Sequence, residues 1–469
     1  MLELFCANLS RRSTHSVLLV RSDLDAPIWI SSQECLKLAL GECNFTCCET
    51  NHLGPRGDSK MKCSRKNVKT VLSRMIDAKA NHLSMMKNAV HGRWTRVLKH
   101  WWLRDLDENG WVTPFSSCGA DNLKKDLKTW LDWDKNIDGT FFDRDGVSLL
   151  IYAVCANHFE AVRYLLNEIN ESCKSNDKER RYYTESCIPK NGVLHFGIPG
   201  SCTALIGAMT IASPEIVQLL LENGANPYAT DVNGNSPFMC ACTYNRVDNV
   251  KFWLKQFPMW NLEARNTVVG GFALGCAVYM GPNRLELVKL LLKSGTHINM
   301  LTFAGGSSFT AACENEDADP QVIRLLLNHG SDMKYRVRAT VLKWKVIRQV
   351  AKITVRGFKT SNGLLRYIAK ESGATALHYA VMRGDMEIVE LLLSEGADPN
   401  LKNDLGQNAA AMCKGFPELQ RVLEEWEGKT KLQSAAKKKQ VLEVPGGKIS
   451  TVIPVQHEVE KYIHGDIPS

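Results

Sequence analysis

The chain has 469 residues, 44% of them hydrophobic, and carries 58 Lys and Arg against 50 Asp and Glu, a formal net charge of +8. It contains no run of 18 apolar residues, which excludes a membrane-crossing helix, and its length allows more than one domain. The first twelve residues, MLELFCANLSRR, lack the basic and apolar layout of a secretory signal.

The sixteen cysteines are interpreted as reduced thiols rather than as a disulfide framework, because so long a chain does not need covalent staples. Six of them lie in apolar stretches, where a thiol acts as a small hydrophobe: Cys155, Cys202, Cys240, Cys242, Cys276 and Cys313. We therefore expect an intracellular, reducing location, in the first place the cytoplasm. Lys437 to Lys439 leave the nucleus open as an alternative.

Residues 1–86 show the least regular pattern. Cys43, Cys47, Cys48, His52 and Cys63 are zinc-ligand types, but their spacing lacks the paired two-residue knuckles of structural zinc sites. We expect a poorly defined, cysteine-bearing leader here and no zinc site.

Residues 88–104 predict a basic amphipathic helix with Trp94, Val97, Leu98, Trp101 and Trp102 on one side. Two interpretations are open. The helix could precede a cation-binding loop, or it could be a helical target for a calmodulin-like partner. The residues that follow it favour the first.

Two loops with oxygen-bearing side chains at alternate positions come next, and such oxygens can converge on a hard cation. The candidate ligands of the first loop are Asp105, Asp107, Asn109 and the backbone carbonyl of Trp111, with a glycine at position six. Those of the second, 29 residues further on, are Asp134, Asn136, Asp138, the carbonyl of Thr140, and Asp145.

This tandem resembles a pair of EF-hands, which implies binding of Ca²⁺ or, with less selectivity, Mg²⁺. Position twelve departs from the family's bidentate glutamate, because it is Ser116 in the first loop and the shorter Asp145 in the second. The second loop is therefore the better candidate for cation binding. The alternative is that neither loop binds a cation and that the pair serves only hydrophobic packing. Asp145-Gly146 also begins the next module, so we hypothesise that calcium bound there would affect it.

From residue 147 onwards one apolar signature recurs, V-x-x-L-L or a variant, often with glycine three residues later. It is anchored at Val162, Val217, Val250, Val288, Ile323, Val389 and Leu419. The spacing is close to 33 residues, and two longer gaps hold a repeat plus an insertion. The pattern within each unit predicts two short helices. One such pair cannot bury its apolar stripe alone, so the units must stack on one another.

The best copy, residues 372–400, resembles an ankyrin repeat. The matching positions are Thr375, Leu377, His378 and Ala380, then Gly396, Ala397, Asp398 and Asn400. The resemblance covers about 280 residues. It implies a mainly α, ankyrin-type helical solenoid that binds other proteins on its concave face and hairpin tips, with His378 as a turn-and-cap residue and not a base.

We thus predict a helical solenoid with insertions, preceded by a small helical EF-hand-like domain. The expected division is a poorly defined segment (1–86), an EF-hand-like pair (87–146), a repeat array (147–428, with insertions 170–198 and 334–371) and a tail (429–469).

The insertion Lys334 to Lys370 holds eleven Lys or Arg and no Asp or Glu. The rest of the chain sums to −3, because the whole is +8 and this segment contributes +11. Its period is ambiguous between helix and strands, and its β-branched residues favour strands. Nucleic acid, an anionic membrane or an acidic protein would each fit such a segment, and so would simple packing on the array with solvated charges.

No triad order, zinc-protease motif, phosphate loop or kinase signature occurs, so we predict a non-enzymatic interaction scaffold with no catalytic residue. The calcium loops would regulate it, and the alternative is an adaptor that acts through residues 334–370. The protein partner is not identified by the sequence. Candidate contact residues near the hairpin tips are Tyr228, Met300, Lys334 and Leu401.

Overall fold

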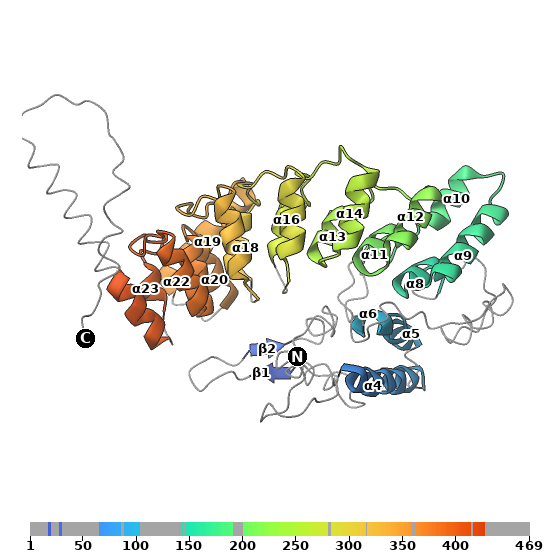
Figure 1. The fold of residues 1–469 in the computed structure, drawn as a ribbon, viewed down its shortest axis with the longest axis horizontal. Coiled ribbons are helices and arrows are strands. Elements are labelled where there is room, and N and C mark those ends of the chain that lie inside the picture. Colours follow the sequence, from blue (N-terminus) through green and yellow to red (C-terminus); the bar gives the residue numbers. More distant parts are fainter. Residues whose placement is uncertain are drawn as a thin grey trace, which may run out of the picture.

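The computed structural model of the chain describes residues 17–19, 28–30, 65–85, 89–103, 140, 142–143, 146–190, 200–279, 283–315, 317–358, 363–413 and 416–426. Most of the described chain forms one curved array of short helices (Figure 1). Among the described residues, no helix combines the length and the apolar content needed to cross a membrane.

The array consists of helix pairs. The inner helices are α8 (Leu149–Cys155), α11 (Ala204–Ile211), α13 (Pro237–Thr243), α15 (Ala273–Tyr279), α17 (Ser308–Glu314), α21 (Ala376–Arg383) and α23 (Ala409–Met412). The outer helices are α9 (Phe159–Ser172), α12 (Pro214–Glu222), α14 (Val247–Gln256), α16 (Leu285–Lys293), α18 (Pro320–Asn328), α22 (Met386–Ser394) and the helical residues 417–426. Each inner helix packs against the inner helices of its neighbours, and consecutive outer helices from α9 to α18 likewise contact one another.

The recurring sequence signature forms the core of this array. The seven anchor residues of the signature are at most 1% exposed, and burial of each such aliphatic side chain stabilises the fold by about 1.5–3 kcal/mol. Gly396 follows α22 with a φ of 94°. Gly224, Gly295 and Gly330 adopt the same backbone conformation at the equivalent place after α12, α16 and α18, where a side chain would be strained.

Polar side chains fix the beginnings of the inner helices. Ser236 accepts a hydrogen bond from the backbone N–H of Met239, and Ser307 accepts one from that of Thr310. These caps satisfy backbone groups that the helix itself leaves unpaired. Similar caps begin α8, α11 and α23, so the hairpins and the inner helices keep a similar relation along much of the array.

The amino-terminal helices pack on each other and on the first repeat. Helix α4 (Arg65–Met85) lies against α5 (Ala89–Val97), which is followed by α6 (Lys99–Trp102) and contacts α8. The predicted amphipathic helix over 88–104 is thus present as α5 and α6, with Trp94 and Trp102 at most 1% exposed. The boundary expected at residue 86 falls between α4 and α5, which form one packed pair. A short antiparallel pair, β1 (Val17–Leu19) and β2 (Ile28–Ile30), precedes them.

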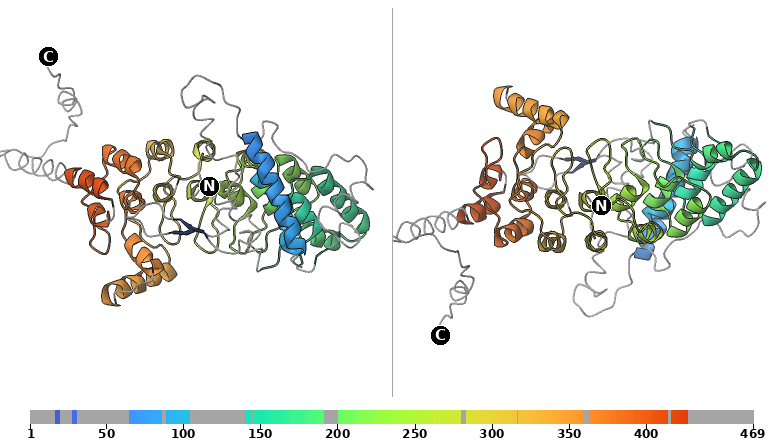
Figure 2. Two further views of the ribbon diagram at one scale, coloured as in Figure 1. Left: turned by 90° about the horizontal axis from the view of Figure 1, so that it is seen from below. Right: turned by 90° about the horizontal axis from the view of Figure 1, so that it is seen from above.

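The two insertions contain helices of their own. The first contributes α10 (Asp177–Thr184). The second forms a hairpin of α19 (Leu342–Phe358) and α20 (Gly363–Glu371), so the strands favoured by its β-branched residues were the wrong prediction. The helical spacing wins because it buries Arg348 and Ala351 while α19 packs against α20. Figure 2 shows this hairpin projecting from the side of the array.

Candidate interaction surfaces

The four predicted contact residues occupy different environments. Tyr228 is 73% exposed, whereas Met300 is only 9% exposed and belongs to the core, so Met300 offers a partner little surface. Lys334 is exposed and Leu401 is half-buried. All four lie in the turns that follow outer helices, but they do not form one cluster of contacts.

An aromatic cluster gathers around Tyr228. Its ring stacks on Trp260 of the next hairpin, with 5.3 Å between centroids and 19° between planes. Trp260 in turn packs edge-on against Trp253 at 5.0 Å, and Trp253 is fully buried in α14. The neighbouring Met259 is 96% exposed. A buried tryptophan thus supports an exposed surface of large, adaptable side chains.

Hydrogen bonds between successive hairpins hold their tips in place. The backbone N–H of Thr267 donates to the carbonyl of Asn233, and that of Phe303 donates to the carbonyl of Val269. Within one hairpin, the buried Asp231 accepts hydrogen bonds from the backbone N–H groups of Asn233 and Asn235. The tip surface is therefore preorganised, which lowers the entropic cost of binding.

His378 has the capping role that the ankyrin resemblance implied. Its Nδ1 accepts a hydrogen bond from the backbone N–H of Thr375 at 3.2 Å, so its Nε2 carries the proton and donates to the carbonyl of Gln407 at 3.2 Å. The pKa of His378 is lowered, chiefly by burial. The side chain is neutral and joins two adjacent repeats.

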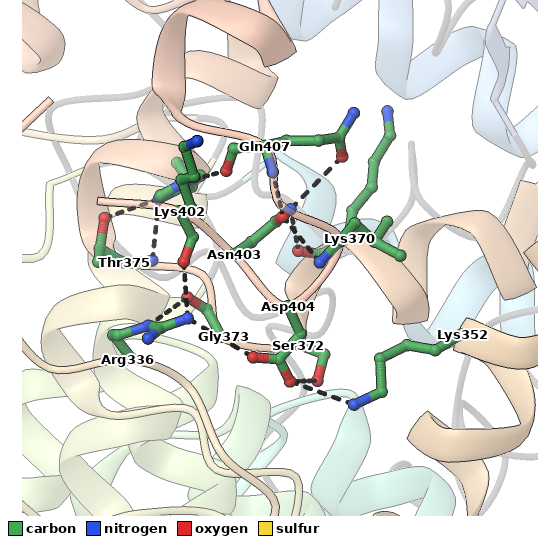
Figure 3. A network of polar contacts seen from close by, with 12 residues as sticks. Arg336, Lys352, Lys370, Ser372, Gly373, Thr375, Lys402, Asn403, Asp404 and Gln407 are labelled. Carbon is green, nitrogen blue, oxygen red and sulfur yellow. Dashed lines mark hydrogen bonds and ion pairs between the residues drawn. The ribbon is translucent and has the colours of Figure 1, made fainter. Parts of the chain in front are cut away.

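Polar contacts fasten the helical insertion to the hairpin that follows it (Figure 3). Asp404 accepts hydrogen bonds from Ser372 at 2.7 Å and from Lys352 of α19 at 3.2 Å. Burial alone would raise the pKa of Asp404, but these two donors and the charge of Arg336 hold it below its usual range. Arg336 also donates to the carbonyls of Gly373 and Lys402.

A second group of contacts ties α20 to the inner helices. The hydroxyl of Tyr367 donates to Glu314 at the end of α17, and that of Tyr379 donates to Glu371 at 3.3 Å. Glu371 also pairs with Arg348 at 3.4 Å. Burial raises the pKa of both Glu314 and Glu371. The insertion is thus docked on the array and does not hang from it as a free loop.

The second predicted calcium loop lies mostly outside the described residues. That holds for Asp134, Asn136, Asp138 and Asp145, and for Asp105, Asp107, Asn109 and Trp111 of the first loop. Only Thr140, Phe142 and Asp143 are described. Phe142 stands at position nine without a side-chain oxygen, and its backbone pairs with Ser148. The described part of the chain contains no group of three or more His, Cys, Asp or Glu that could hold a metal.

Asp143 joins this loop to the helices on either side. It forms an ion pair with Arg93 of α5 at 3.1 Å and accepts the hydroxyl of Tyr152 of α8 at 2.8 Å. Its other carboxylate oxygen accepts the backbone N–H of Val147 at 2.9 Å. Both oxygens of the Asp143 carboxylate thus accept hydrogen bonds from protein donors.

The buried thiols agree with the hydrophobic role expected of them. Cys155, Cys202, Cys240, Cys242 and Cys313 are buried and unpaired, and Cys276 is partly buried. Burial raises the pKa of Cys155 to about 12 and that of Cys276 to about 11. Thiols that stay protonated are poor nucleophiles.

Sequence reasoning named Tyr228 but missed its partners. Met259 and Trp260 stand where the other strong repeats have the glycine-alanine turn. That replacement of small residues by large apolar ones is the signal in the sequence that could have identified them.

Comparison with known proteins supports the repeats directly. A family model described as ankyrin repeats (3 copies) matches residues 205–302 and 274–403. The matched ranges do not include either calcium loop. The predicted ankyrin repeats are therefore confirmed, and with the helix pairs described above they make the chain a mainly α, ankyrin-type solenoid.

Two known proteins are similar to parts of this chain. The B-cell lymphoma 3 protein homolog of Mus musculus is 27% identical over 267 residues, which cover 56% of this chain and 47% of that protein. The ankyrin repeat and KH domain-containing protein mask-1 of Caenorhabditis elegans is 25% identical, over 44% of this chain and 9% of its own. The chain thus spans less than half the length of these two relatives.

Two solved structures are also similar. The ankyrin repeat domain of Bcl-3 is 24% identical with a TM-score of 0.39, and covers 60% of this chain and 100% of its own. The human ASB11 ankyrin repeat domain is 17% identical with a TM-score of 0.41, over 60% of this chain and 98% of its own.

Proposed function

We propose that the chain is a non-enzymatic scaffold that binds a partner protein through the hairpin tips around Tyr228 and Met259. The observation that carries this proposal is the exposed aromatic stack of Tyr228 on Trp260. Protein-binding hot spots are rich in tyrosine, tryptophan and methionine that sit on a rigid support. The hydrogen bonds between hairpins supply such a support.

The concave face formed by the inner helices is the second candidate surface of the same scaffold. Tyr279, at the end of α15, is 50% exposed. The relatives are proteins with ankyrin repeats, which supports protein binding as the general activity but assigns no partner to this chain.

The test is affinity capture with the full-length chain as bait, followed by mass spectrometry. Three variants are compared with the unchanged chain: Tyr228→Ser with Met259→Ser at the tips, Tyr279→Ser on the inner face, and Val71→Ser on α4 as a control at another exposed apolar residue. We expect the tip variant to lose one or more specific proteins that the control retains. Capture of the same proteins by all four chains would contradict the proposal.

Calcium binding by the second loop is a separate proposal. It is supported by the oxygen spacing of Asp134, Asn136 and Asp138, and weakened by Phe142 at position nine. Asp143 supplies a route by which order in this loop would reach α5 and α8, because it contacts Arg93 and Tyr152. An ion bound there would neutralise the carboxylates of the loop.

Calcium is titrated into the full-length chain over a millimolar magnesium background, with calorimetry as the measurement. Saturable binding that Asp134→Ala abolishes, and that the exposed-carboxylate control Asp248→Ala leaves unchanged, is the expected result. Hydrogen exchange of residues 147–169 with and without calcium then tests the coupling. Identical protection in both states would remove the coupling while leaving the scaffold proposal intact.

The absence of enzymatic activity and an intracellular location stay predictions. Ankyrin repeats are interaction modules in general. The buried, unpaired thiols support a reducing compartment. Binding through the basic insertion 334–370 is the alternative function.

A further inference from the structure

The outer face of α19 carries an exposed apolar stripe. Leu342, Val346, Val350 and Ile353 are 75%, 53%, 52% and 55% exposed. Their spacing of four, four and three residues places all of them on one side of the helix. Four large aliphatic side chains in a continuous line are not the scattered apolar residues of an ordinary surface.

The opposite face of α19 is fastened to the protein. Ala351 is fully buried, and the Arg348 side chain, 4% exposed, pairs with Glu371. Lys352 pairs with Asp404 of the following hairpin. A partner cannot wrap around a helix held in this way, as a calmodulin-like protein would, without undocking it. Only the face of α19 that carries the apolar stripe is open to a partner.

The charge around the stripe has one sign. Lys343 and Lys345 are exposed beside it, and the whole segment 334–370 has eleven Lys or Arg without an acidic residue. The carboxylates that α19 contacts, Glu371 and Asp404, lie on its fastened face. The exposed face is therefore both apolar and cationic.

From this geometry we infer that α19 is a docking helix for an anionic lipid surface. A helix of 17 residues is about 25 Å long and can lie flat in the plane of a membrane, with its aliphatic stripe between the acyl chains and its lysines at the headgroups. The hairpin projects from the side of the array (Figure 2), so a planar surface can reach it.

Other occupants fit the same face less well. Nucleic acid would place phosphates against an apolar stripe, and a second copy of the chain would bring two cationic faces together. An acidic protein groove would match the charge, but it would have to accommodate a helix whose other half is already covered. The inference is independent of the proposed function, since the Tyr228 surface lies on different repeats.

The experiment is vesicle co-sedimentation of the full-length chain, with phosphatidylcholine vesicles that contain or lack phosphatidylserine. The stripe variant is Val346→Ser, Val350→Ser and Ile353→Ser. Its control removes three similarly exposed valines elsewhere, by Val71→Ser, Val232→Ser and Val268→Ser. Circular dichroism verifies that each variant keeps the helix content of the unchanged chain.

A charge variant, Lys343→Glu with Lys345→Glu, is paired with the control Lys289→Glu and Lys293→Glu on α16. We expect the unchanged chain and both controls to bind the anionic vesicles and to bind neutral vesicles far more weakly. The stripe variant and the charge variant should each lose at least about tenfold in partitioning. Raised salt should also weaken binding.

Several outcomes would overturn the inference. The unchanged chain could fail to bind anionic vesicles, or the stripe variant could bind them as well as its control does, which would leave only a nonspecific attraction between charges. If the unchanged chain bound an immobilised polyglutamate peptide but not the anionic vesicles, the exposed face of α19 would be assigned to an acidic protein instead. None of these results would affect capture through Tyr228.

Discussion

Arg93 and Asp143, fifty residues apart, form an ion pair of 3.1 Å whose side chains are 13% and 2% exposed. The pair joins α5 of the amino-terminal helices to the segment that leads into the first repeat. Trp94, the residue beside Arg93, packs on Tyr152 with 4.9 Å between ring centroids. The amino-terminal helices are therefore part of the first repeat's core.

This relationship predicts that Asp143→Ala destabilises the chain by about 3 kcal/mol. The substitution leaves Arg93, the hydroxyl of Tyr152 and the N–H of Val147 without the carboxylate that they contact. Urea unfolding measures the effect. Arg324→Ala breaks a pair with Glu395 that is 58% and 39% exposed, and it should cost no more than about 1 kcal/mol. Equal losses in the two variants would show that Asp143 carries no special role.

His378 predicts a dependence of stability on pH. Because burial lowers its pKa in the folded chain, the unfolded chain takes up the proton more readily. The contribution of His378 is thus complete above its unfolded pKa of about 6.5 and is lost as pH falls below that value. The unchanged chain should be more stable than His378→Gln at neutral pH. This difference in the free energy of unfolding should become smaller at mildly acidic pH. A constant difference would mean that folding does not lower the pKa of His378.

The two partly buried glutamates, Glu314 and Glu371, should respond differently to neutralisation. Burial raises the pKa of Glu314, so its charge opposes folding at neutral pH, and Glu314→Gln keeps an oxygen for the hydroxyl of Tyr367. We expect this variant to be as stable as the unchanged chain, or more so. Glu371 also has a pKa raised by burial, but its ion pair with Arg348 at 3.4 Å opposes that shift, so Glu371→Gln should gain less stability than Glu314→Gln or lose some.

Thermal unfolding at neutral pH compares these two variants. Since the pKa of Glu314 is raised in the folded state, its unfavourable contribution is present above the folded pKa and disappears as pH falls through it. The advantage of Glu314→Gln should therefore vanish on acidification. Destabilisation by both variants to the same degree would mean that the charge of Glu314 favours folding, contrary to its raised pKa.

Two glycines with the same backbone conformation differ in their surroundings. Gly305 and Gly396 have φ values of 91° and 94°. A Cβ at Gly305 would lie 2.0 Å from the carbonyl oxygen of Arg338, whereas one at Gly396 meets nothing within 4 Å. Gly396→Ala should cost about 1 kcal/mol from the left-handed φ alone, and Gly305→Ala clearly more. Similar melting temperatures for the two variants would contradict this close approach of the hairpins.

The repeat array could be predicted from the sequence because its information is local and periodic. The seven anchors, the glycine after each strong unit and the motif around His378 all act within one repeat. The insertion could not be predicted as helical, because Val346, Ile347, Val350 and Ile353 favour strands by propensity. The helix depends on tertiary contacts of Arg348 and Lys352 with residues outside it.

The same distinction applies to the candidate surfaces. The Tyr228–Trp260 stack joins two hairpins, and the Arg93–Asp143 pair joins two modules, so neither follows from any single stretch of sequence. The calcium loops illustrate the reverse case. Their oxygen spacing is legible in the sequence, but most of their residues lie outside the part of the chain that the structure describes.

The buried thiols give the array a property of practical use. Cys155, Cys242 and Cys313 lie in inner helices of different repeats, whereas Cys187 is exposed. An alkylating reagent should modify Cys187 at once and reach each of the others only when its own repeat opens. The chain therefore carries internal markers along its length, and the order in which they are labelled would reveal from which end the solenoid frays.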